Sequence, residues 1–296
     1  MTVGGSARAP RLDPLEVRRT LKREGLRASH ARSQNFLADP DVLEAILDLA
    51  DVDAGTRVLE IGPGLGILTG GLLACGAHVT AVELDRSLAA YLREQHAAAI
   101  AEGRLDLLEG DALDLDLPDL VPPPFRVVAN IPYHITSPLL HRLLEREPRP
   151  DRLVLMVQAE VADRIAAAPG QMSYLSVFVQ VHATVRVALR VPPEAFEPAP
   201  NVASAVVVLE PRREPVLPPE RAAALWGLVQ AGFRERRKML RNVLARQLRH
   251  GEDGATGPLV GQARVDAALK AAHIAGDRRP QTLSVDDWVR LLEALR

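Results

Sequence analysis

Short apolar runs alternate with glycine-containing turns and longer helical stretches between about residues 56 and 209. The runs at 56–61, 78–82 and 105–109 are five or six residues long and rich in Val, Leu and Ile, as buried strands are. The apolar stretch at 67–73 separates the first two runs and predicts a helix. This alternation predicts an α/β fold in which helices cover both faces of a mostly parallel sheet, with later strands at 153–157, 183–190 and 204–210.

Helical patterns flank this α/β region. A helix is predicted to begin at Pro40 and to be capped by Asp39. Beyond a proline-rich stretch at 211–219 the pattern predicts only helices, at 220–234, 238–249, 265–272 and, with Ser284 as its cap, 285–295. We therefore expect three parts: a basic N-terminal extension at 1–29 with a short helix over 15–26, an α/β domain at 30–212, and a small all-helical domain at 213–296.

A glycine-rich loop follows the first predicted strand. It reads Gly-Pro-Gly-Leu-Gly at 62–66, and glycines there allow the backbone to approach a ligand closely. Glu83 ends the second strand about 20 residues later, a spacing at which an acid can bind the two hydroxyls of a ribose. Asp111 follows the third strand, where its carboxylate can accept a hydrogen bond from the amino group of an adenine. This order predicts a nucleoside site at the carboxyl edge of the sheet.

The spacing of the loop also bears on which nucleotide could bind. A dinucleotide is compatible with a glycine loop, but Gly-x-Gly-x-Gly is not the six-residue pyrophosphate fingerprint, and the acid Glu60 precedes it. S-adenosylmethionine carries no phosphate and fits the loop better. The alternative is a tight turn that serves only packing.

The segment Asn130-Ile131-Pro132-Tyr133 follows an apolar strand and suits a pocket for a planar amino group. The N6 nitrogen of adenine is a poor nucleophile, so a catalyst should accept hydrogen bonds from its hydrogens and hold the ring flat. The side-chain oxygen of Asn130 and the carbonyl of Ile131 can be two such acceptors, since Pro132 fixes the turn. Tyr133 offers a ring for stacking. The alternative is an Asx-Pro turn with a half-buried tyrosine.

Together, these motifs resemble those of the ribosomal RNA adenine dimethyltransferases. The resemblance rests on Asn-Ile-Pro-Tyr at 130–133, Glu-Ile-Gly-Pro-Gly at 60–64, Glu83 and Gly110-Asp111. Further similar segments lie at 34–37, 154–164, 196–204 and 233–242, the last resembling a basic helix of the family. The similarity spans about residues 34–296. In length and C-terminal sequence the chain resembles the bacterial enzymes that dimethylate two adjacent adenosines near the 3′ end of small-subunit (16S) RNA.

The resemblance implies a Rossmann-like class I methyltransferase domain at 30–212 and an RNA-binding helical domain at 213–296. It implies S-adenosylmethionine as cofactor, with contacts from Asn35, Leu37, Gly62, Gly64, Glu83, Asp111 and Asn130. The implied catalytic residues are Asn130, Tyr133 and Phe196, with Phe196 as a second aromatic wall opposite Tyr133. Without the resemblance, Phe196 is more simply a core residue in a proline-rich turn.

The implied reaction is transfer of methyl groups to N6 of adenosines in 16S rRNA, within the immature small ribosomal subunit. Because the target nitrogen lies in folded RNA, the base must be splayed out into the site. Three other interpretations stay open. They are a DNA adenine methyltransferase, a large-subunit (23S) RNA dimethylase, and an assembly factor that binds immature small subunits and uses methylation as a release signal.

A net charge of −2 hides a marked asymmetry along the chain. Residues 1–35 hold 8 basic against 3 acidic residues and residues 211–296 hold 16 against 10, whereas the middle holds 12 against 25. The basic ends are expected to hold RNA phosphates, above all through a cluster within two predicted helical turns: Arg234, Arg236, Arg237, Lys238 and Arg241. The alternative is an ordinary solvated surface in an arginine-rich protein, since 33 of the 36 basic residues are Arg.

The remaining composition narrows the class of protein. The single cysteine, Cys75, excludes a disulfide framework and favours a cytoplasmic location. No apolar run of about 18 residues is present, and residues 1–10 lack the apolar core of a signal peptide, so no membrane association is expected. The histidines are scattered without ligand spacing, so no metal site is expected. We expect a monomer.

Overall fold

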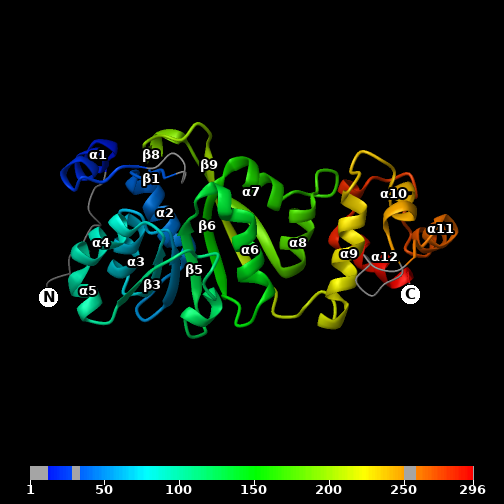
Figure 1. The fold of residues 1–296 in the computed structure, drawn as a ribbon, viewed down its shortest axis with the longest axis horizontal. Helices are drawn as coiled ribbons and strands as arrows, with labels where there is room; N and C mark the ends of the chain where they lie inside the picture. Colours follow the sequence, from blue (N-terminus) through cyan, green and yellow to red (C-terminus); the bar gives the residue numbers. More distant parts are fainter. Residues whose placement is uncertain (1–12, 29–33, 250–257, 296) are drawn as a thin grey trace, which may run out of the picture. The chain divides into compact units, whose positions relative to one another are not determined.

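The computed structural model describes residues 13–28, 34–249 and 258–295. The chain divides into two compact units, drawn in Figure 1. The first consists of Met1–Ala162 and Arg186–Pro211, and the second of Asp163–Val185 and Arg212–Arg296. The sequence-based boundary after residue 212 lies within one residue of the last of the three points at which the chain passes between the units. Residues 163–185 differ from expectation, because their contacts group them with the second unit rather than with the α/β domain.

The first unit contains a seven-stranded sheet in the order β4-β3-β2-β5-β6-β9-β7. Strands β2 to β6 pair in parallel, and β9 runs antiparallel to β6. Their bounds are β2 Arg57–Ile61, β3 His78–Glu83, β4 Leu105–Glu109, β5 Arg126–Asn130, β6 Arg152–Gln158, β7 Ala183–Val191 and β9 Ser204–Pro211. The central part of β6 is completely buried, as expected for a parallel strand covered on both faces. The predicted Rossmann-like α/β fold is confirmed.

Helices connect and cover these strands (Figure 1). They are α2 Pro40–Ala50, α3 Ile67–Ala74, α4 Arg86–Gln95, α5 Ala97–Ala101, α6 Thr136–Glu145 and α7 Ala159–Ile165. The start of α2 follows the sequence-based prediction, since an Asp39 side-chain oxygen accepts hydrogen bonds from the backbone of Asp41 and Val42, at 2.9 and 3.1 Å. Buried side chains of α2 and α3 pack with those of the sheet in one large core.

Two short strands that the pattern did not predict connect distant parts of the first unit. Strand β1, Phe36–Leu37, pairs antiparallel with β8, Phe196–Glu197. Two residues are too few for an alternating pattern to be visible in the sequence. Their pairing brings residues 34–37 beside the segment at 196–204.

The second unit is helical around its own apolar core. Its helices are α8 Tyr174–His182, α9 Ala222–Phe233, α10 Leu240–Gln247, α11 Gln262–Ala271 and α12 Val285–Ala294. Trp288 is completely buried, and Gly232 makes room for it, because a Cβ at that position would lie 2.5 Å from the indole ring. Ser284 caps α12 as predicted and forms a capping box with Asp287.

Short 3₁₀ turns link several of these elements, at Leu117–Leu120, Tyr133–Ile135, Pro193–Ala195, Pro219–Arg221 and Pro280–Thr282. The helix α1, Pro14–Arg23, matches the short helix expected in the N-terminal extension. Within the described ranges, every helix is too short or too polar to cross a lipid bilayer.

Candidate active site

A cleft lies at the carboxyl ends of β2, β3, β4 and β5. In open parallel sheets this edge is the usual place for ligands, because the strand-to-helix loops converge there. Five stretches of chain supply most of the lining: 34–37, 60–65, 82–84, 110–112 and 130–135. The fold therefore gathers into one cleft every residue expected to contact the cofactor, together with Tyr133.

The glycine loop forms a tight turn at the end of β2. Gly62, Gly64 and Gly66 all have positive φ, at 67°, 61° and 75°, which side chains other than glycine rarely adopt. Gly64 has a second constraint, since a Cβ there would lie 3.0 Å from the ring of Phe36. Its backbone N–H donates to Oε2 of Glu83 at 3.0 Å. The loop is therefore fixed both by its own backbone and by the acid at the end of β3.

Two buried acids lie behind this loop. Burial raises the pKa of Glu83, although backbone N–H groups, including those of Asp85 and Gly64, stabilise its charge. Burial raises the pKa of Glu60 to about 8, against a hydrogen bond from the Thr69 hydroxyl at 2.7 Å. Among the described residues that line the cleft there is no Arg or Lys. The cleft is therefore suited to a cationic ligand rather than to a phosphate.

Asp111 and Leu84 complete the part of the cleft nearest β4. Asp111 lies after β4, and its Oδ1 accepts a hydrogen bond from the backbone of Leu113 at 2.8 Å, which fixes the side chain. Leu84 lines the cleft although 48% of its surface is exposed. Our sequence analysis missed Leu84. An apolar residue placed directly after Glu83, the acid expected to bind a ribose, was the available signal, since an exposed leucine there can pack against a planar ring.

Asn130 ends β5, and its carboxamide is oriented by a neighbouring segment of the same polypeptide. Its Nδ2 donates to the backbone oxygen of Asn35 at 3.2 Å. No described residue bonds its Oδ1, so that oxygen can accept a hydrogen bond from a ligand. The backbone N–H of Ile131 donates to Met156 on β6 at 3.1 Å, which anchors the turn that follows.

Tyr133 is half-buried at the side of the cleft. Its hydroxyl lies 2.9 Å from the hydroxyl of Ser204 on β9, and burial raises its pKa. The hydrogen bond fixes the ring at its hydroxyl end, and the residue lines the cleft. Tyr133 is thus half-buried, as the alternative of an Asx-Pro turn predicted, but it also lines the cleft.

Phe196 differs from its expected position. It is 2% exposed and packs in the main core of the first unit, and it is absent from the cleft lining. Its backbone pairs with Leu37 of β1. In this structure Phe196 does not present an aromatic wall to the cleft but supports the strand that carries Leu37.

Most of the basic segment of the second unit is a turn between two helices. The residue pattern predicted helices at 220–234 and 238–249, whereas the resemblance implied a basic helix over 233–242. Helix α9 ends at Phe233 and α10 begins at Leu240. At the start of α10 the backbone N–H of Leu240 donates to the Arg278 carbonyl at 2.8 Å, a tertiary contact that fixes where this helix begins. Arg234 is held by Gln247, at 3.1 Å. In this turn the basic side chains of Arg236, Arg237 and Lys238 are exposed, and no described residue forms a hydrogen bond with them.

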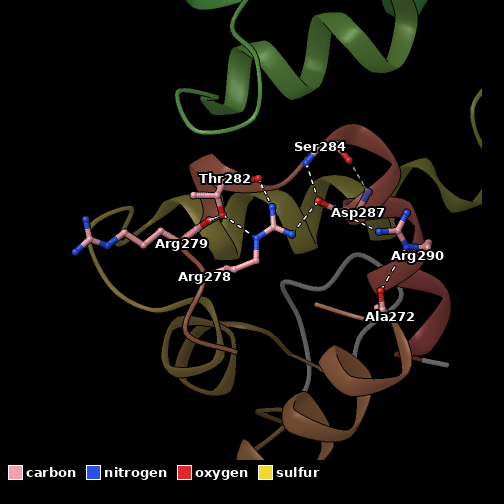
Figure 2. Close-up of polar contacts among 7 residues, drawn as sticks. All are labelled: Ala272, Arg278, Arg279, Thr282, Ser284, Asp287 and Arg290. Atoms are coloured by element: carbon pink, nitrogen blue, oxygen red, sulfur yellow. Dashed lines mark hydrogen bonds and ion pairs between the residues drawn. The ribbon is translucent and has the colours of Figure 1, made fainter. Parts of the chain in front are cut away.

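A second basic segment, at 276–279, lies against this turn. Gly276 allows the stem of Arg241 to cross its backbone, since a Cβ there would lie 3.1 Å from Cδ of Arg241. Figure 2 shows the Arg278 guanidinium directed toward Thr282 and Asp287, and the Arg279 side chain directed away from them. The Arg278 guanidinium and Asp287 are 3.2 Å apart. Arg279 therefore joins Arg241 as an exposed cation, which our sequence analysis did not single out.

Asp287 is the centre of the cluster in Figure 2. Its burial opposes ionisation, but the backbone N–H of Ser284 and the guanidinium groups of Arg278 and Arg290 outweigh it and lower the pKa of Asp287. An ionised, well-bonded carboxylate holds the segment before α12 in place. No group of three or more His, Cys, Asp or Glu side chains in the described part of the chain is arranged to hold a metal ion.

Comparison with known families identifies the family to which this chain belongs. The family model described as ribosomal RNA adenine dimethylase matches residues 26–290. The chain belongs to this family. The dimethylase family accounts for the combination of a nucleoside cleft with an Asn-Ile-Pro-Tyr turn at its edge, and its members are methyltransferases.

Individual relatives agree with the family assignment. The ribosomal RNA small subunit methyltransferase A of Anaeromyxobacter sp. (strain K) is 41% identical, over 94% of this chain and 97% of the relative. Among solved structures, a dimethyladenosine transferase from Plasmodium falciparum has a TM-score of 0.72 and 27% identity, over 86% of this chain and 95% of the other. The 23S rRNA methyltransferase ErmE has a TM-score of 0.70 and 29% identity, over 88% and 99%.

Proposed function

We propose that this dimethylase transfers methyl groups from S-adenosylmethionine to N6 of two adjacent adenosines near the 3′ end of 16S rRNA, in the immature small ribosomal subunit. The choice of the small subunit is supported by relatives named for it, which match nearly the whole chain. The observation that carries the proposal is the position of Asn130. It lies in a cleft with two buried acids and orients its free oxygen through Asn35.

The residues of the cleft fit S-adenosylmethionine. The lining includes the acids Glu83 and Asp111 and contains no Arg or Lys among its described residues, which suits a sulfonium cation and disfavours the phosphates of a dinucleotide. Glu83 would hold the ribose hydroxyls and Asp111 the adenine amino group, with Leu84 against the ring. Asn35 and Leu37 would line the methionine end. When bound, the cofactor supplies an electrophilic methyl group.

Asn130 and the Ile131 carbonyl would accept hydrogen bonds from the two hydrogens of the target amine. These bonds favour a pyramidal nitrogen whose lone pair is available, so they strengthen as the amine attacks. Tyr133 would stack on the extruded base, and its bond to Ser204 fixes the ring before the base arrives. No general base is needed before attack, because the neutral amine is the nucleophile and loses its proton afterwards.

The exposed cations of the second unit would bind RNA phosphates. Arg236, Arg237, Lys238 and Arg241 are proposed contacts from sequence, and Arg279 extends the surface. Arg234 has a smaller share in this role, because Gln247 already accepts a hydrogen bond from it. Phosphate contacts of this kind set affinity and orientation, whereas the cleft selects the base.

The proposal is tested by incubating the protein with labelled S-adenosylmethionine and three substrates: small subunits that lack the modification, 23S rRNA, and duplex DNA. We expect label in the small subunits, at two adjacent adenosines near the 3′ end of 16S rRNA. Labelling of 23S rRNA instead would favour the function of the structurally similar 23S enzyme. Binding of small subunits by Asn130→Ala without methylation would show that binding and catalysis are separable.

A further inference from the structure

The helix α1 belongs to the extension that the sequence analysis expected to be a basic lead-in. Asp13 caps it by accepting a hydrogen bond from the backbone of Glu16 at 2.8 Å, and Pro14 is its first residue. Its polar face is exposed, but Val17 is completely buried and Thr20 is nearly so. A helix that buries one face in this way is packed on the rest of the first unit and is not a free arm.

The residues beneath α1 are also residues of the cofactor cleft. Val17 packs in a small apolar cluster that includes Phe36, Leu65 and Leu88, with Ile67 at its margin. All four of these partners line the cleft. The ring of Phe36 in turn lies against Gly64, in the glycine loop. We call these four cleft residues the wall. One side of the wall meets the cleft, and the other side meets α1.

A second contact ties α1 to the strand pair beside the cleft. Arg18 donates two hydrogen bonds to the carboxylate of Glu197, at 3.0 and 2.9 Å. Glu197 belongs to β8, which pairs with the Phe36–Leu37 strand, and Figure 1 shows α1 close to both. A fork of two parallel bonds fixes orientation as well as distance. It therefore holds α1 in register with the wall.

We infer that α1 is a brace for the cofactor cleft, and that Val17 and Arg18 are positioning residues that act through Phe36, Leu65 and Glu197. This inference rests on the proposed function, in which the cleft holds S-adenosylmethionine. Packing of α1 keeps the wall in its binding conformation before the cofactor arrives. The cost of ordering that wall is then met on folding rather than on binding.

The test compares two matched truncations in the full-length protein. Val17→Ala removes two methyl groups beneath α1, and Val208→Ala removes the same two groups from β9, where the valine is equally buried but lies outside both the cleft lining and the cluster beneath α1. Binding of S-adenosylmethionine is measured by calorimetry well below each variant's Tm. We expect Val17→Ala to raise the Kd about fivefold and Val208→Ala to leave it within about twofold.

Two further readouts separate positioning from loss of stability. In methylation assays, Val17→Ala should raise the KM for the cofactor and leave kcat nearly unchanged. Arg18→Glu and Glu197→Arg should each weaken cofactor binding about twofold, and the double exchange should restore it, since exposed ion pairs have small effects. If the wild-type protein binds the cofactor and Val17→Ala binds it with the same Kd, the inference that α1 braces the cleft is wrong. Failure of the wild-type protein to bind the cofactor would instead overturn the proposed function.

Discussion

The cleft of the first unit and the basic surface of the second are built in opposite ways. The cleft is lined by strand ends and a positive-φ glycine loop, and it contains buried acids whose pKa values are raised. The basic surface consists of exposed side chains on the turn between α9 and α10 and on the segment before α12. The difference matches what the two proposed tasks require. Holding a reacting pair demands fixed geometry, whereas binding a charged backbone demands mainly the right charge in the right area.

The two regions should therefore respond differently to mutation. In the cleft, one polar atom in a site sheltered from water has a large effect, because its interactions are poorly screened. On the basic surface each cation contributes a small, salt-dependent share. The following changes test this contrast, from the largest expected effect to the smallest.

Replacing Asn130 by Ala should have the largest effect. The change removes the side-chain acceptor at the target amine, so kcat should fall about 10²- to 10³-fold, as for the loss of one preorganised polar contact in other enzymes. Single-turnover methylation of small subunits measures it. His134→Ala is the matched control, since His134 also lines the cleft but has no proposed part in the reaction. Full methylation by Asn130→Ala would show that the amine is held by other groups.

Replacing Glu83 by Gln should mainly affect cofactor affinity. The change keeps the shape of the side chain but replaces a charge-assisted acceptor of the ribose hydroxyls, so the Kd should rise about 10- to 100-fold. Calorimetry with S-adenosylmethionine measures it. Glu109→Gln is the control, because Glu109 ends the adjacent strand but pairs with Arg86 and Arg93 on α4. Equal effects of the two variants would contradict the ribose assignment.

The triple change Arg236→Ala, Arg237→Ala and Lys238→Ala should weaken RNA binding without disturbing the cleft. Three lost phosphate contacts should lower the slope of log affinity against log salt by about 2–3. Filter binding of small subunits over a range of KCl measures the slope. Cofactor affinity should stay at the wild-type value. Arg104→Ala, which removes a partly exposed arginine of the first unit that pairs with Glu102, should leave the slope unchanged. A wild-type slope in the triple variant would remove these residues from the RNA-binding surface.

The smallest effect expected is a pH-dependent change in stability on replacing Glu60 by Gln. The folded pKa of Glu60 is about 8, above its ordinary value of 4.5. The stability associated with this group is therefore fully present below about pH 4.5 and is lost as the pH rises through about 8. Glu60→Gln cannot ionise, so its Tm should rise relative to that of the wild-type protein as the pH increases from 5 to 9. A constant difference in Tm across this range would show that Glu60 is not buried as a neutral acid.

The contrast between the two regions also explains which parts of the site could be predicted. Asn130 and Glu83 are the last residues of β5 and β3, Asp111 lies two residues beyond β4, and the ends of neighbouring parallel strands meet at one edge. Their gathering into one cleft therefore follows from strand order alone. The basic segment has no such rule. Its charge and the break between two helices are visible in the sequence, but the contact that fixes the start of α10 is not, because the backbone N–H of Leu240 bonds Arg278, almost 40 residues away.

The sequence by itself determined the α/β fold of the first unit, the helical character of the second, the caps Asp39 and Ser284, and the loops that line the cleft. These features depend on side-chain periodicity and on bonds between near neighbours, which the order of residues makes visible. Only the tertiary structure decided that Phe196 is buried, that 163–185 join the second unit and that α1 covers the cleft wall. Those outcomes depend on packing between segments far apart in the chain, and no local pattern encodes which apolar surface will be covered by which partner.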